Sequence, residues 1–125
     1  MASEYPTTWS ALKYPWQRDE LLAYLEELAT PDPRTMWDQD QRRGLISGID
    51  QVIHFFFDDH DFDEGDVGYS LFDPREANAV GAVKNALDVL MAELPKGSDD
   101  DYVAHPLWSA VTKAAASASN HMKSR

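Results

Sequence analysis

The sequence contains no cysteine among its 125 residues. This absence excludes disulfide bonds, thiolate nucleophiles and zinc sites with cysteine ligands. A chain without disulfides fits a reducing compartment, so we expect a cytoplasmic protein. The G-x-G-x-x-G motif and the P-loop are missing as well, and we expect no cofactor.

Basic residues are scarce. Eleven lysines and arginines stand against 22 aspartates and glutamates, which gives a net charge of −11 at pH 7. Binding to nucleic-acid phosphates needs the opposite balance, and an anionic membrane surface repels such a chain. We therefore expect no nucleic-acid or membrane partner, whereas the charge suits a basic protein partner.

Long apolar runs are also missing. The most apolar stretch, residues 52–57, is short and includes His54, whereas a transmembrane helix needs about 20 apolar residues. The first nine residues lack the charged and apolar segments of a secretory signal peptide. The chain does have the length of one domain and 43% hydrophobic residues, enough for a buried core.

Apolar residues recur at helical spacing through most of the chain and nowhere alternate as in a β-strand. A first helix is predicted over residues 15–29, because proline suits a first helical position and Pro31 then stops the helix. Residues 1–14, with their scattered aromatics, are predicted to form an irregular N-terminal arm. Residues 15–125 are predicted to form a single helical domain.

A second helix is predicted between Thr35 and Asp58. Its buried stripe is expected to comprise residues 45, 46, 49, 52, 53 and 56. Gly44 and Gly48 disfavour a continuous helix, so we expect a break in this segment or a helix start near Arg42.

Asp73 begins the clearest helix in the sequence. Its carboxylate can accept the amide hydrogen of Glu76, the Glu76 carboxylate can reach back to the Asp73 amide, and Pro74 suits the first turn. A last helix, with alanines on its buried face, is predicted after residue 105. Together these patterns predict an all-α fold, a compact bundle of four principal helices with an irregular N-terminal arm and an acidic loop.

Several short motifs, taken in order along the chain, resemble a known family. They are Tyr14-Pro15-Trp16, Thr30-Pro31-Asp32-Pro33, Trp37, the helix over residues 49–54, Gly68 with Leu71, Asp73 with Glu76, and His105-Pro106-Leu107-Trp108. Over residues 14–120 the chain resembles a family of small, uncharacterised, mostly actinobacterial proteins. The resemblance implies a compact helical domain, and it implies no activity, cofactor or catalytic residue.

More than half of the net charge falls in one short segment. Residues 58–66 hold no lysine or arginine and six acids, namely Asp58, Asp59, Asp61, Asp63, Glu64 and Asp66. An EF-hand is rejected, because Glu64 stands where the calcium loop needs glycine and Ser70 where it needs a bidentate glutamate. We interpret the segment as a solvated acidic loop, with a docking surface for a basic partner and an irregular cation site as alternatives.

Asp50, His54 and Asp58 are four residues apart, so they share one face of an α-helix. Such a face could bind a transition metal through imidazole nitrogen and carboxylate oxygen. The alternative is a polar, solvent-exposed face, on which the neighbouring acids favour the charged form of His54.

Three consecutive phenylalanines, residues 55–57, cannot share one face of an α-helix. Phe56 belongs to the apolar stripe, whereas Phe55 points to another side. Either further segments cover this helix on several sides, or Phe55 belongs to an exposed interface.

These features leave three hypotheses for the function. The first is a non-enzymatic interaction module, for example an immunity-type inhibitor of a basic toxin, because the chain is acidic and carries no catalytic motif. The second is a metal-binding protein or metal-dependent hydrolase that uses the carboxylates of residues 50–66. The third is a structural homodimer built on aromatic or alanine-rich helix faces, and we expect either a monomer or a homodimer.

Overall fold

Helices dominate residues 11–124, the part of the chain that the computed structural model describes. The six α-helices of this part are α1 (Pro15–Ala29), α2 (Arg34–Arg42), α3 (Ile49–Ile53), α4 (Pro74–Glu93), α5 (Asp99–Ala104) and α6 (Trp108–Lys123). A π-helix, η2 (His54–Asp59), continues α3, and a 3₁₀ helix, η3 (Glu64–Asp66), follows in the acidic loop. Residues 11–124 contain no β-strand, so the predicted all-α class is confirmed.

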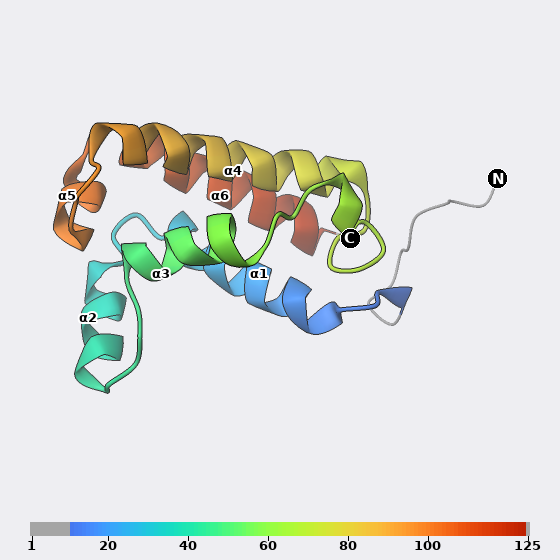
Figure 1. The fold of residues 1–125 in the computed structure, drawn as a ribbon, viewed down its shortest axis with the longest axis horizontal. Helices are drawn as coiled ribbons and strands as arrows, with labels where there is room; N and C mark the ends of the chain where they lie inside the picture. The colour runs from blue at the N-terminus through green and yellow to red at the C-terminus, as the bar shows by residue number, and fades with distance from the viewer. Residues whose placement is uncertain (1–10, 125) are drawn as a thin grey trace.

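The three long helices form the body of the molecule (Figure 1). Helix α6 packs against both α1 and α4, and it runs back alongside α4. The side chains that these helices bury are mostly leucine, valine and alanine; they include Leu21, Leu25 and Leu28 of α1, Val80, Val83, Leu87 and Leu90 of α4, and Val111, Ala115 and Ala118 of α6. Small alanines let helices approach closely, and here they serve packing within the domain.

The start of the domain agrees with the prediction that Pro15 begins α1. Residues 1–10 of the predicted arm lie outside the described residues. Within the rest of that arm, Leu12 is buried, and the amides of Lys13 and Tyr14 donate to the carbonyls of Gly68 and Tyr69 at 3.0 and 2.9 Å. These contacts join residues 12–14 to the segment that precedes α4.

The predicted second helix is broken, as its glycines indicate. Helix α2 ends at Arg42, and α3 begins only after Gly48, whose φ of +129° is unfavourable for other residues. Leu45 and Ile46 lie in the connecting turn and are 57% and 85% exposed. Their predicted place in the buried stripe is wrong, because helical spacing no longer applies once the chain leaves the helix.

Asp99 of α5 caps the N-terminal end of α3. Its Oδ1 accepts the amide hydrogen of Ile49 at 2.8 Å. A Cβ at Gly48 would lie 2.9 Å from both Asp99 carboxylate oxygens, so only glycine leaves room for this contact. A residue distant in sequence therefore caps α3, which the sequence pattern did not indicate.

Phe55 is buried, with 1% of its surface exposed, so it does not form part of an exposed interface. Its ring stacks on Tyr24 of α1 at 4.1 Å and lies 5.4 Å from Phe62 of the acidic loop, measured between ring centroids. A π-helix has more residues per turn than an α-helix, so consecutive side chains diverge less around its axis. Phe55 and Phe56 can therefore both face the core.

The start of α4 contains a buried ion pair. Asp73 Oδ1 accepts the Glu76 amide hydrogen at 3.1 Å, as predicted. The Glu76 carboxylate does not turn back to the Asp73 amide; it accepts from the Phe72 amide at 2.7 Å and from both terminal nitrogens of Arg18 at 2.6 and 2.7 Å. Arg18 and Glu76 are fully buried, and their pairing ties α1 to α4.

Candidate functional site

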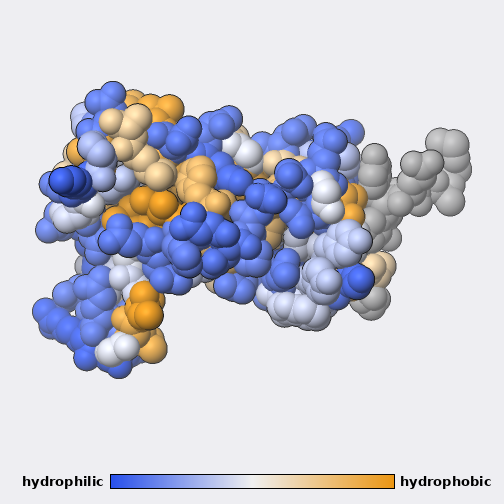
Figure 2. Space-filling model, viewed as in Figure 1, coloured by the Kyte–Doolittle hydropathy of each residue, from blue (hydrophilic) through white to orange (hydrophobic). Residues whose placement is uncertain are grey.

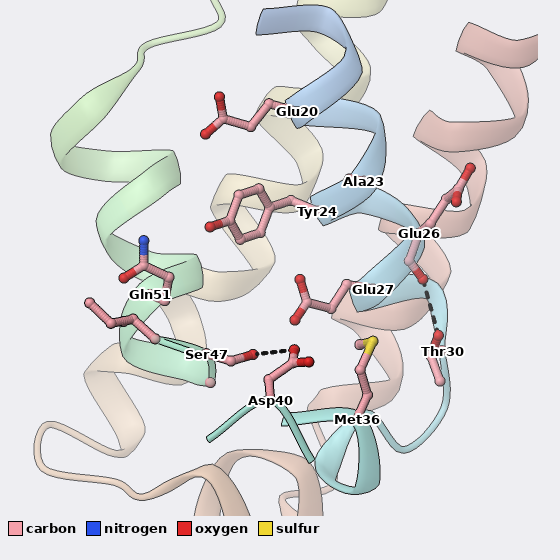
Figure 3. A pocket seen from close by; sticks show the side chains of 12 residues that line it. Glu20, Ala23, Tyr24, Glu26, Glu27, Thr30, Met36, Asp40, Ser47 and Gln51 are labelled. Atoms are coloured by element: carbon pink, nitrogen blue, oxygen red, sulfur yellow. Dashed lines mark hydrogen bonds between the residues drawn. The ribbon is translucent and has the colours of Figure 1, made fainter. Parts of the chain in front are cut away.

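A pocket of about 520 Å³ lies between α1, α2 and α3. One wall is α1, the opposite wall is α3 with the turn before it, and α2 closes one end (Figure 3). The residues that line it are Glu20, Ala23, Tyr24, Glu26, Glu27, Thr30, Met36, Asp40, Ile46, Ser47, Gly48 and Gln51. This pocket is our candidate site.

The lining of the pocket carries negative charge and includes no lysine, arginine or histidine. Glu27 of α1 and Asp40 of α2 direct their carboxylates toward the same space, and Glu20 lies further along α1 (Figure 3). Glu26 points away and pairs with Lys123, with 2.6 Å between its Oε1 and Nζ. Three carboxylates therefore remain without a cation among the residues that form the pocket.

Glu27 is half-buried at the centre of this group. Burial raises the pKa of its carboxyl group above the usual value, the hydrogen bond from the Trp37 indole acts against this, and the charge of Asp40 raises the pKa further. The negative charge of Glu27 therefore carries a free-energy cost that an incoming cation would relieve.

In each of the two central carboxylates, Glu27 and Asp40, one oxygen already accepts a hydrogen bond. Trp37 Nε1 donates to Glu27 Oε1, and Ser47 Oγ donates to Asp40 Oδ2 at 3.1 Å. The other oxygens, Glu27 Oε2 and Asp40 Oδ1, have no hydrogen bond within residues 11–124. These contacts orient both carboxylates and leave each with a free acceptor.

Tyr24 links the pocket to the acidic loop. Burial raises the pKa of its hydroxyl, a hydrogen bond with Gln51 lowers it, and the charges of Glu27, Glu20 and Asp59 raise it. The hydroxyl is therefore a neutral donor at physiological pH. The charges of Glu27 in the pocket and of Asp59 at the start of the acidic loop thus act on the same hydroxyl.

The six predicted partner-binding acids are not brought together at one point. Asp63 and Asp66 cap η3 through a reciprocal pair of hydrogen bonds, and Glu64 lies exposed between them. Lys84 donates to the backbone carbonyl of Asp61 at 3.0 Å, and the buried Phe62 anchors the loop to the core. Asp61, Phe62, Asp63 and Asp66 therefore make contacts that stabilise the conformation of the loop itself.

Part of the loop does border a second hollow, of about 390 Å³. Asp59, Asp61 and Asp66 line it together with Tyr14 and Tyr69. This hollow is smaller than the pocket beside α2, and three acidic residues of the loop line it.

The predicted metal-binding residues Asp50, His54 and Asp58 are not gathered around one point in the structure. His54 Nδ1 lies 2.8 Å from Asp58 Oδ2, and its Nε2 lies 3.2 Å from Asp59 Oδ1. The ring is thus held between two carboxylates, and the hydrogen bond with Asp58, with the charge of Asp59, raises the pKa of His54. No group of three or more such ligands within residues 11–124 is arranged to hold a metal ion.

Sequence reasoning did not single out Glu27, Asp40 or Tyr24. One signal was available, because Glu20, Tyr24 and Glu27 follow the i, i+4, i+7 spacing of one helix face. Nothing in the spacing shows that Asp40 joins them, since that depends on how α2 packs.

The structure thus defines an all-α domain with an acidic pocket beside its main helical body. The chain belongs to the family described as Domain of unknown function (DUF7945), which it matches over residues 12–125. Neither a curated protein nor a solved structure matches it. Among the helices of the described residues, none has the length and apolar character needed to cross a membrane.

Proposed function

We propose that this protein is a non-enzymatic, cytoplasmic interaction module that binds a basic protein partner. The observation that carries the proposal is the concave, cation-free pocket around Glu27 and Asp40. A cleft lined by charge of one sign concentrates the electric field and attracts an oppositely charged ligand. The net charge of −11 adds long-range attraction for the same kind of partner.

The binding surface extends from the pocket toward the acidic loop. Asp40 and Glu27 occupy its centre, Glu20 continues it along α1, and Asp59 marks the near end of the loop. In this arrangement the loop accelerates the approach of the partner, whereas the pocket holds one of its cationic side chains.

The test is a selection from a library of random peptides on the immobilised protein. We expect the selected peptides to be enriched in lysine and arginine and to bind more weakly as salt is raised. The E27Q/D40N variant preserves both hydrogen-bond acceptors but removes two charges, so it should bind these peptides about tenfold more weakly.

The matched control is D88N/E93Q, which removes the same two residue types from exposed positions on α4. It should bind the selected peptides as the original protein does, apart from a small, salt-screened loss. Peptides without an excess of basic residues, or equal affinity for E27Q/D40N and the control, would contradict the proposal.

A further inference from the structure

An exposed apolar lip borders the acidic pocket. We define the lip as Met36, Leu45 and Ile46, which are 38%, 57% and 85% exposed. Met36 and Ile46 line the pocket itself. Helix α2 and the turn after it project from the three long helices in Figure 1, and Figure 2 shows hydrophobic surface on this projection.

The turn that carries Leu45 and Ile46 of the lip is held by a set of hydrogen bonds. Gln41 Nε2 donates to the Ser47 carbonyl at 2.7 Å, Ser47 Oγ donates to Asp40 at 3.1 Å, and the Leu45 amide donates to the Asp40 carbonyl at 3.0 Å. Ile46 is therefore presented to solvent by an ordered turn. The same contacts orient the Asp40 carboxylate, so the lip and the charged centre form one unit.

We infer that the pocket and its lip bind a protein segment in which an arginine lies next to a bulky aliphatic residue. The inference rests on the proposed function, since it specifies the partner chemistry of the same pocket. The negative lining of the pocket selects the cation, and the lip selects its apolar neighbour.

Arginine fits the pocket better than lysine does. Glu27 Oε2 and Asp40 Oδ1 come from two different helices, and both are free to accept. A guanidinium group carries five donors in a planar fork, so it can bind two separate carboxylates, whereas a lysine ammonium is a compact, strongly hydrated charge. The methylene groups of arginine can also lie against Met36.

The aliphatic neighbour would cover surface that the protein leaves open. Ile46 lines the pocket and Leu45 is its exposed neighbour in the chain, so a side chain adjacent to the bound arginine can reach them. Burial of apolar surface on both partners then adds affinity to the charge contact.

The test uses an array of short peptides that share one fixed residue pair and random flanks. We expect arginine followed by leucine or isoleucine to bind at least about fivefold more tightly than arginine followed by serine. It should also bind about fivefold more tightly than lysine followed by leucine. The L45S/I46S variant should lose the preference for the aliphatic neighbour and retain the preference for arginine over glutamine.

Val89→Ser is the matched control, because Val89 is an exposed aliphatic residue of α4 outside the pocket; it should preserve both preferences. Circular dichroism establishes that each variant is folded, and Ile46→Ser alone provides a milder variant. Preference for arginine without any effect of its neighbour overturns this inference and leaves the proposed function intact. If the original protein shows no preference for basic residues in the array, both this inference and the proposed function are overturned. If the protein is a dimer in sedimentation and L45S/I46S dissociates it, the lip binds a second copy of the chain and the inferred peptide partner is wrong.

Discussion

Two glutamates of this protein experience opposite electrostatic environments. Glu76 is fully buried, and Arg18 neutralises it through two short hydrogen bonds while the Phe72 amide donates a third. Glu27 is half-buried and receives one hydrogen bond from the neutral Trp37 indole, and its charged neighbour is the carboxylate of Asp40. The domain thus supplies a cation for one carboxylate and leaves the other without one.

This difference separates charge that holds the fold together from charge that is available for binding. A buried carboxylate without a counter-charge destabilises a protein, so Arg18 is a structural requirement at Glu76. At Glu27 burial opposes the charge of the carboxylate and raises its pKa, and the pocket around it is open to solvent. A carboxylate without a counter-charge at an open pocket is what a cation-binding surface needs.

The largest expected effect comes from removing the cation at Glu76. Arg18→Met leaves a buried, uncompensated carboxylate, so the free energy of unfolding in urea should fall by about 3–5 kcal/mol. The double variant R18M/E76Q should recover part of this loss, because its glutamine is neutral and can still accept from the Phe72 amide.

Arg34→Met is the matched control for this change. Arg34 pairs with Asp32 and Asp100 at the surface, and exposed pairs of this kind contribute about 0–1 kcal/mol. If R18M were no more destabilising than R34M, the buried pair would not have the structural role that we assign to it.

The second prediction is a substitution that raises the free energy of unfolding. Glu27→Gln keeps an acceptor for the Trp37 indole and removes the costly charge, so it should stabilise the protein at pH 7 by about 0.5–2 kcal/mol, the usual range for optimised charges. The folded-state pKa of Glu27 is raised, so its favourable contribution is present below the usual value of 4.5 and is lost as the pH rises through the raised pKa. The advantage of the variant in chemical denaturation should therefore shrink as the pH falls through the raised pKa, and it should be smallest below pH 4.5. A destabilised variant at pH 7 would contradict this account of Glu27.

The smallest effect on stability is expected at His54, because its imidazole loses its positive charge as the pH rises. The hydrogen bond with Asp58 and the charge of Asp59 raise the pKa of His54, so their contribution to stability is complete below the usual value of 6.5 and is lost as the pH rises through the raised pKa. The original protein should exceed His54→Gln in stability at acidic pH and match it at alkaline pH. An NMR titration that places the pKa of His54 at or below 6.5 would refute the pairing.

The sequence was most informative where a helix carries its own signals. Pro15 began α1 as expected, and Asp73 capped α4 through the amide of Glu76. These are local interactions between residues at most three positions apart, so spacing alone reveals them. Predictions became wrong where the chain left regular helix, as at Leu45 and Ile46. At Phe55 the sequence left two alternatives open, and the structure decides for the one in which other segments cover the helix on several sides.

By itself, the sequence determined the all-α class, the first and fourth helices, and the position of the densest negative charge. Each of these follows from residues that are neighbours in the chain, where propensity, capping and composition act. Only the tertiary structure decided that Arg18 neutralises Glu76, that Asp99 caps α3, and that Glu27 and Asp40 share a pocket. Such contacts join helices that are distant in sequence, and they depend on how side chains of different elements pack together.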